Sequence, residues 1–286
     1  MKWQGRDGSS NVSRGSSGGG PVKIGGVGLL LLVIVYSLFG GNPRDIINEQ
    51  NRTQQEQQVN NSEKASSKEV EEAEKMLSVV LKDTEDVWHE KFSEINKNYE
   101  EPKLHFFEGA VSTGCGNADK NVGPFYCSLD QTIYMDVTFY NMLTQKLGAD
   151  GGDYAMAYVL AHEVGHHVQK ELGILDRVHN IQRRLNEKDA NKYSVALETQ
   201  ADYFAGVFSY YIKEKGYLEE GDIEEAISAV QSVGDDHIQK MGQGYVQPEK
   251  FTHGSSELRN EWFQRGFKYH DFEHADSFGE MGLRIQ

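Results

Sequence analysis

The feature that most constrains this chain is the pair His162 and His166, four positions apart, with Glu163 directly after the first. The surrounding residues are mostly small or apolar, a pattern typical of a helix packed inside a core. Residues four apart share one face of an α-helix, so both imidazoles can point at one ion. Burying these polar side chains without partners would be costly, and a bound metal removes that cost. The alternative, a helix with two surface histidines, is disfavoured by the apolar surroundings.

A catalytic zinc site takes three protein ligands and keeps a further position for water. A third histidine shortly after the motif is absent, because Gln169 and Leu172 occupy the corresponding places. We therefore predict that Glu198, in a second apolar helical segment, is the third ligand. Asp202 lies one turn later on the same face and is predicted to accept a hydrogen bond from the outer N–H of a ligand histidine. The alternative is an acidic pair on a solvated helix face.

These residue types point to hydrolysis at a metal-bound water. A metal ion lowers the pKa of the water, and Glu163, about 100° around the helix from His162, is placed to act as general base. His253 precedes a helix that Ser255 or Ser256 can cap, and it is a candidate donor to the oxyanion of a tetrahedral intermediate. The alternative for His253 is a surface histidine. Arg259 is a weaker catalytic candidate, and His167 points off the metal face.

The stretch from Ile24 to Pro43 carries no charged side chain, and as a helix it would be about 30 Å long, the thickness of a hydrocarbon core. We predict a transmembrane signal-anchor helix over residues 24–43. Basic residues precede it and the following sequence turns acidic, so the positive-inside rule predicts a single-pass protein of the cell membrane with a cytoplasmic N-terminus and an extracytoplasmic catalytic domain. A cleaved signal peptide and a buried globular helix are the alternatives; the long leading segment argues against the first.

The rest of the chain divides by composition. Residues 1–23 are rich in Gly and Ser and are predicted to form a disordered cytoplasmic tail. Residues 44–67 are predicted to form a flexible stalk and residues 68–286 the catalytic domain. The expected fold class is α+β, mainly helical, with a small sheet before the active-site helix. Helical spacing covers residues 68–98, 153–172, 175–186, 190–215, 223–233 and 256–269, and short strands are expected at 103–108 and 132–136.

Two further features bear on the compartment and the substrate. Cys115 and Cys127 lie in one turn-rich stretch and are predicted to form a disulfide in an oxidising compartment, with two free thiols as the alternative. Residues 123–136 are a candidate for the edge strand that holds an extended peptide; an ordinary strand is the alternative. The formal net charge of −15 excludes a nucleic-acid backbone as the expected partner.

The order of these motifs resembles the gluzincin class of metallopeptidases and, more closely, the bacterial putative neutral zinc metallopeptidase family. The resemblance covers essentially the whole chain and implies a zincin-like domain, one zinc ion per chain and endopeptidase activity on a peptide or protein substrate. The resemblance to gluzincins also places the peptide-binding edge strand before the active-site helix, at Thr132–Asp136. Two other functions fit the same residues: a metal-stabilised cell-surface binding protein without turnover, and a zinc hydrolase of a non-peptide envelope amide. The matching motifs are residues 1–6, 123–127, 162–168, 198–206 and 252–256, followed by Arg259, Trp262 and Phe263.

Overall fold

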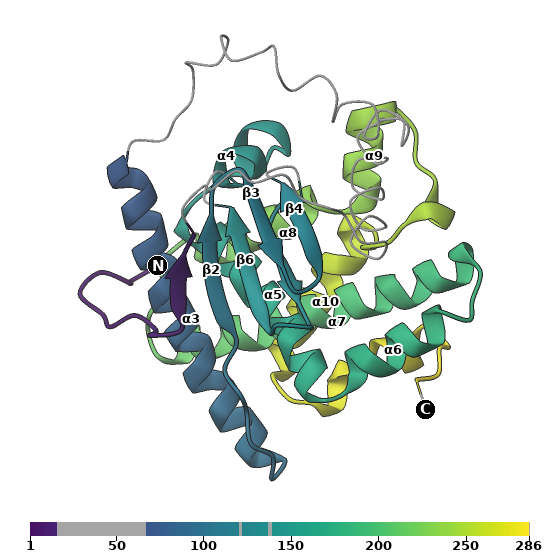
Figure 1. The fold of residues 1–286 in the computed structure, drawn as a ribbon, viewed down its shortest axis with the longest axis horizontal. Coiled ribbons are helices and arrows are strands. Elements are labelled where there is room, and N and C mark those ends of the chain that lie inside the picture. Colours follow the sequence, from purple (N-terminus) through teal and green to yellow (C-terminus); the bar gives the residue numbers. More distant parts are fainter. Residues whose placement is uncertain (16–66, 120–121, 137–138, 286) are drawn as a thin grey trace.

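The computed structural model describes residues 1–15, 67–119, 122–136 and 139–285. A mixed sheet lies on one side of the molecule and a group of packed helices lies behind it (Figure 1). The strands are β1 (Val12–Arg14), β2 (Lys103–Phe107), β3 (Ala110–Thr113), β4 (Gly116–Asp119), β5 (Phe125–Cys127) and β6 (Thr132–Asp136).

The helices account for most of the described residues. The longer ones are α3 (Ser67–Glu94), α5 (Asp153–Glu171), α6 (Ile174–Gln182), α7 (Glu187–Glu214), α8 (Asp222–Ser232), α9 (Asp235–Gln243) and α10 (Ser256–Tyr269). The shorter ones are α4 (Phe139–Asn141), the π-turn η1 (Met142–Lys146), the 3₁₀ turns η2 (Pro248–Lys250) and η3 (Glu273–Ala275), and α11 (Ser277–Glu280). The predicted fold class, mainly helical α+β with a small sheet, is confirmed.

The main sheet has the order β1-β2-β6-β5 within the described part of the chain. Strands β1, β2 and β6 are parallel, and β5 runs antiparallel to β6. Leu104 lies opposite Ile133 and Phe106 opposite Met135, and all four side chains are buried in the main core. Since β6 lies between two other strands, the expectation that Thr132–Asp136 forms the substrate-binding edge is wrong. The edge of the sheet on this side is β5, which lies within the wider candidate range 123–136.

Helix α5 is the centre of the helical layer. It packs against α3, α7 and α8, and its residues from Tyr154 to Gly165 are all buried. A helix that is buried on every side needs apolar residues all round, which explains the largely apolar run from Tyr154 to Ala161, before His162. Gly165 allows α7 to come close, because a Cβ atom at this position would lie 2.9 Å from the carbonyl oxygen of Ala201.

The disulfide and the small hairpin lie beside β5. Strands β3 and β4 form a separate antiparallel pair, and Cys115 in the turn between them is bonded to Cys127 at the end of β5. The cross-link therefore ties the hairpin to the edge of the main sheet.

The first fifteen residues belong to the folded domain, so the prediction of a disordered tail is wrong for residues 1–15. Val12–Arg14 forms β1 on the open side of β2, and the indole N–H of Trp3 donates to Asp153 at the start of α5 over 2.7 Å. The guanidinium of Arg6 pairs with Asp83 and lies 3.6 Å from the centre of the Tyr217 ring. Low apolar content predicts disorder, but this segment is held mainly by polar side chains with partners in the domain.

The other regions predicted near the N-terminus cannot be compared with the structure. The rest of the predicted tail (16–23), the predicted span (24–43) and almost all of the predicted stalk lie outside the described residues. Ser67, the last residue of that stalk, opens α3. Across the ranges that the structure does describe, we find no helix with the length and apolar character needed to cross a membrane.

The N-terminal contacts yield a stability prediction. Arg6→Ala removes the cation beside Asp83, whose side chain is only 2% exposed. A buried carboxylate that loses its partner is destabilising, so we expect the free energy of unfolding to fall by about 1–3 kcal/mol. Denaturant-induced unfolding of the full chain measures this change.

Arg14→Ala is the matched control in the same segment. Arg14 is half exposed and pairs with Glu74 over 3.4 Å, so its loss should cost less than about 1 kcal/mol. Equal effects of the two substitutions would show that Asp83 does not depend on Arg6.

Candidate metal centre

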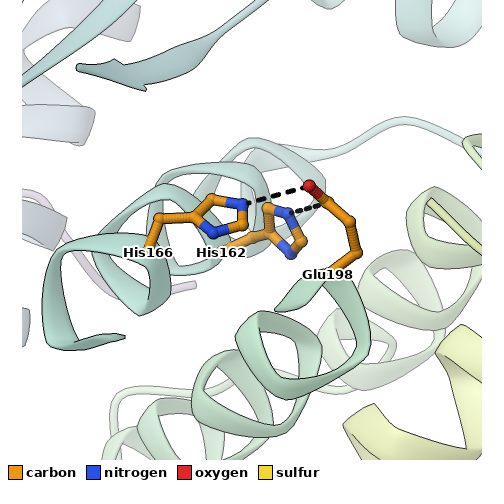
Figure 2. Close-up of side chains that lie close together, drawn as sticks. All are labelled: His162, His166 and Glu198. Atoms are coloured by element: carbon orange, nitrogen blue, oxygen red, sulfur yellow. Dashed lines mark hydrogen bonds and ion pairs between the residues drawn. The ribbon is translucent and has the colours of Figure 1, made fainter. Parts of the chain in front are cut away.

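Three side chains from two helices converge at the site. His162 and His166 point from α5 toward Glu198 on α7 (Figure 2). The Nε2 atom of His162 lies 3.1 Å from one carboxylate oxygen of Glu198, and Nε2 of His166 lies 3.5 Å from the other. The side chains are 8%, 14% and 18% exposed for His162, His166 and Glu198, so the group is shielded but reachable from solvent.

This arrangement fits a zinc ion. Zinc bonds of about 2.0–2.1 Å in a tetrahedron place neighbouring ligand atoms about 3.3 Å apart. The two nitrogen–oxygen distances at the site lie on either side of this value. Two imidazoles with one carboxylate are also a recurrent ligand set of catalytic zinc. Among the described residues, this is the group of His, Cys, Asp and Glu side chains whose donor atoms come close enough to hold one ion.

The electrostatic environment of the group favours a positive charge. Burial acts to lower the pKa of His162, but Asp202 and Glu198 outweigh it and raise that pKa to about 10. The pKa of His166 is also raised, since the charge of Glu198 overcomes the effect of burial. Two carboxylates beside two imidazoles thus stabilise a cation at this point, and a divalent ion would meet the same preference.

Asp202 orients His162 from behind. It accepts a hydrogen bond from Nδ1–H of His162 over 2.8 Å and another from the hydroxyl of Tyr158 over 2.6 Å. Arg259 donates two further hydrogen bonds to it, through Nε over 2.8 Å and Nη2 over 2.9 Å. Burial acts to raise the pKa of Asp202, but Arg259 and His162 outweigh it and lower the pKa. The carboxylate therefore stays ionised and leaves Nε2 of His162 free to face Glu198.

Gln169 orients His166 as Asp202 orients His162, and the sequence analysis did not identify this role. Its side-chain oxygen accepts from Nδ1–H of His166 over 2.9 Å, and its amide nitrogen donates to Leu197 O over 2.7 Å. Gln169 is completely buried, and its hydrogen bonds with His166 and Leu197 O link α5 to α7. The sequence signal that could have indicated this role is its position, three residues after His166 on the same helix.

Glu163 and His253 lie beside the three-residue group. Glu163 is buried, which raises its pKa against the opposing charges of His166 and His162. The charge of His253 acts with that of His166 to hold the pKa of Glu198 well below its usual range, despite burial. The loop that carries His253, distant in sequence, packs against α7 beside Glu198, since a Cβ atom on Gly254 would lie 3.7 Å from the side chain of Thr199.

Asp235 fixes His253 in place, and it too was missed. Its carboxylate accepts from the backbone N–H groups of Thr252, His253 and Gly254 at 2.7, 2.6 and 2.9 Å, and its other oxygen lies 3.3 Å from Nδ1 of His253. Burial acts to lower the pKa of His253, but Glu198 and Asp235 outweigh it and raise the pKa. Asp235 opens α9, a helix that the sequence pattern did not indicate.

His167 lies away from the candidate metal position, as expected from its place on the helix. Its Nε2–H donates to the carbonyl oxygen of Glu100 over 2.6 Å, and Nδ1 accepts from the hydroxyl of Tyr126 over 2.9 Å. Burial lowers its pKa to about 4. The neutral ring thus connects α5 to β5 and to the segment before β2.

Comparison with known proteins gives one family. The sequence model of the family described as "Putative neutral zinc metallopeptidase" matches residues 1–278. The chain is similar to Uncharacterized protein YpfJ of Escherichia coli, with 43% identity over 291 residues that cover 98% of this chain and 99% of that protein. It is also similar to an uncharacterized protein of Mycobacterium tuberculosis, with 41% identity over 195 residues that cover 65% of each. No solved structure matches the chain.

The hydrogen bond between His162 and Asp202 can be tested through metal affinity. Asp202→Asn removes the charge that orients the imidazole, and loss of such a partner lowers metal affinity by about 10–100-fold. Competition with a chromophoric zinc chelator measures the affinity. Asp176→Asn, on the exposed side of α6, is the control and should bind zinc as the parent does. Unchanged affinity in a folded Asp202→Asn variant would exclude the orienting role.

Proposed function

Because the chain belongs to the putative neutral zinc metallopeptidase family, we propose that it hydrolyses peptide bonds at a zinc ion held by His162, His166 and Glu198. The observation that carries this proposal is the approach of the Glu198 carboxylate to both imidazole Nε2 atoms, at 3.1 and 3.5 Å. The residues come from separate helices, and each imidazole has a second partner that fixes its other nitrogen.

Glu163 is proposed as the general base. A bound zinc ion would lower the pKa of a water molecule and polarise the peptide carbonyl. Glu163 follows His162 on α5 and is buried beside the ligand group, where it can take the proton from the attacking water. Its raised pKa supports the second half of the cycle, because a carboxyl group that holds its proton longer can pass it to the leaving amine.

His253 is proposed to stabilise the oxyanion. Its raised pKa favours the protonated ring, and Asp235 holds both the ring and the backbone around it. A fixed cationic donor lowers the energy of a transition state in which negative charge develops on the carbonyl oxygen. Support for this role comes from the position of its loop, where Gly254 packs against Thr199, the residue after Glu198 on α7.

Attachment to a membrane through residues 24–43 is a separate part of the proposal. It is supported by the charge-free stretch in the sequence, which can enter hydrocarbon without burying a charged side chain. The same proposal includes peptide or protein as substrate and endopeptidase activity, in keeping with the family description.

The role of Glu163 gives a direct test. Glu163→Gln removes the base but keeps the size of the side chain, so we expect kcat for peptide cleavage to fall by about 10²–10⁴-fold. Zinc content should remain about one ion per chain, measured by atomic emission on the same preparation. Glu171→Gln, at the end of the same helix, is the matched control and should retain activity. If the zinc-loaded Glu163→Gln protein cleaves peptides at the parental rate, the mechanism is wrong.

The role of His253 appears in the pH profile. The imidazolium is present below its pKa and is lost as pH rises through it, so kcat of the parent should decline on the alkaline side. In His253→Gln we expect kcat to be about 10²–10³-fold lower and this alkaline decline to be absent. His89→Gln, at an exposed histidine on α3, should leave both the rate and the profile unchanged. If the alkaline decline persists in His253→Gln, the decline is caused by another titrating group.

A further inference from the structure

The N-terminal segment is built into the domain by contacts with several elements. The Trp3 indole binds Asp153 at the first residue of α5, and Arg6 binds Asp83 on α3. Farther along, the hydroxyl of Ser9 donates to Glu85 over 2.5 Å, and the side-chain amide of Asn11 donates to the same carboxylate over 2.9 Å. The docking surface therefore includes α3, the start of α5 and the free side of β2, together with Gly216 and Tyr217 after α7.

Two of these partners are buried acids. Asp83 and Glu85 lie two positions apart in α3, and each is only 2% exposed. Arg6 supplies the cation for the first, and Ser9 and Asn11 supply hydrogen bonds for the second. Carboxylates are rarely buried unless they are paired, because the loss of hydration is costly. The buried acids of α3 thus take partners from residues 1–15, with Lys82 of the same helix as a further partner of Glu85 over 3.3 Å.

The backbone of the segment also completes the sheet. Leu104 N–H donates to Asn11 O over 2.9 Å and Gly15 N–H donates to Phe106 O over 3.0 Å, which makes β1 a parallel neighbour of β2. Without β1, β2 would be the edge of the sheet. Strand β1 takes that place with only three residues, and short edge strands limit unwanted pairing with other chains. The segment therefore satisfies both side-chain and main-chain partners.

These contacts conflict with a single crossing of a membrane between residues 15 and 67. A helix that crosses once leaves its two flanks on opposite sides of about 30 Å of hydrocarbon. Residues 1–15 precede the charge-free stretch 24–43, and their partners on α3 and β2 follow it. A chain cannot keep these contacts and also place the two flanks on opposite sides.

The charges that predicted a cytoplasmic N-terminus have another explanation in the structure. Arg6 pairs with Asp83, Arg14 pairs with Glu74, and the ammonium group of Lys2 donates to Gly216 O over 3.1 Å. The positive-inside rule reads basic residues near a span as free charges that remain in the cytoplasm. Here three of them have partners within the same domain, so their presence does not require a separate cytoplasmic tail.

We propose that residues 1–15 remain docked on the α3–β2 surface in the functional protein and lie on the same side of the membrane as the metal centre. The stretch 24–43 then serves as an attachment whose two flanks share one side. This replaces the arrangement expected from the sequence, in which the N-terminus and the catalytic domain were on opposite sides. The proposal does not depend on the peptidase reaction, and its tests use neither zinc nor activity.

The first test is a cross-link in the full chain. Ser13 lies opposite His105 in the β1–β2 register, so Ser13→Cys with His105→Cys should form a disulfide when membranes from expressing cells are oxidised. The native cysteines are bonded to each other and do not compete. Protection from a maleimide-linked polymer, seen as loss of a gel shift, measures the bonded fraction. Ser13→Cys with Lys103→Cys is the control, because Lys103 lies two residues away on β2 and should not cross-link.

The second test asks on which side each part lies. Asp7→Cys and Lys188→Cys place single free thiols on exposed positions of the N-terminal segment and of α7. A membrane-impermeant maleimide applied to spheroplasts should label both variants or neither, with lysed cells as the reference for full labelling. Labelling of one variant alone would overturn the proposal. The proposal would also be overturned if Asp7→Cys and Lys188→Cys report the same side but the Ser13→Cys, His105→Cys pair does not cross-link.

Discussion

The close packing of α5 against α7 is the constraint on which the site depends. Gly165 lies within the histidine motif, and any side chain there would collide with the backbone of Ala201. The resulting approach brings Glu198, one turn before Ala201, within hydrogen-bonding range of the histidines. Helix packing therefore requires a glycine between the two histidines, independently of the chemistry of its neighbours. The ligand geometry follows from a contact between two helix backbones.

Around this contact, the polar side chains form two supports of similar design. On one side Arg259, Tyr158 and Asp202 form a buried group that holds Nδ1 of His162. On another side Asp235 holds the loop that carries His253. In both cases a buried carboxylate is kept ionised by cationic or N–H partners, so its charge is available to orient an imidazole. A fully partnered polar network of this kind makes the side-chain positions specific.

The N-terminal segment shows why composition is a poor guide to order when polar contacts decide. Residues 1–15 contain few apolar side chains, yet Trp3 and Val12 pack against the main core and Arg6 covers a buried acid. The residues that bind this segment, Asp83 and Glu85, are visible in the sequence of α3, but the rest of that helix has an ordinary amphipathic pattern. Residues 1–15 contact both acids, and Arg6 is the ion-pair partner of Asp83. The docking of this segment also bears on how the chain can meet a membrane.

The sequence by itself determined what depends on neighbours along the chain. Helical periodicity placed α5, α7 and α10 within a few residues of their observed limits, and it put His162 beside His166 and Glu198 beside Asp202 on single faces. These features follow from the fixed rise and rotation of a helix. Ser255, one of two residues expected to cap α10, does so by accepting from Leu258 N–H.

Only the tertiary structure decided which partners distant residues meet. It paired Arg259 with Asp202, gave Asp235 to His253, placed β6 inside the sheet and docked β1 beside β2. Each of these depends on the direction in which a helix or strand faces another element, and one sequence carries no periodic signal for that direction. The short strands β1 and β5 were missed for the same reason, since three residues are too few to show an alternation and are held by their neighbours in the sheet.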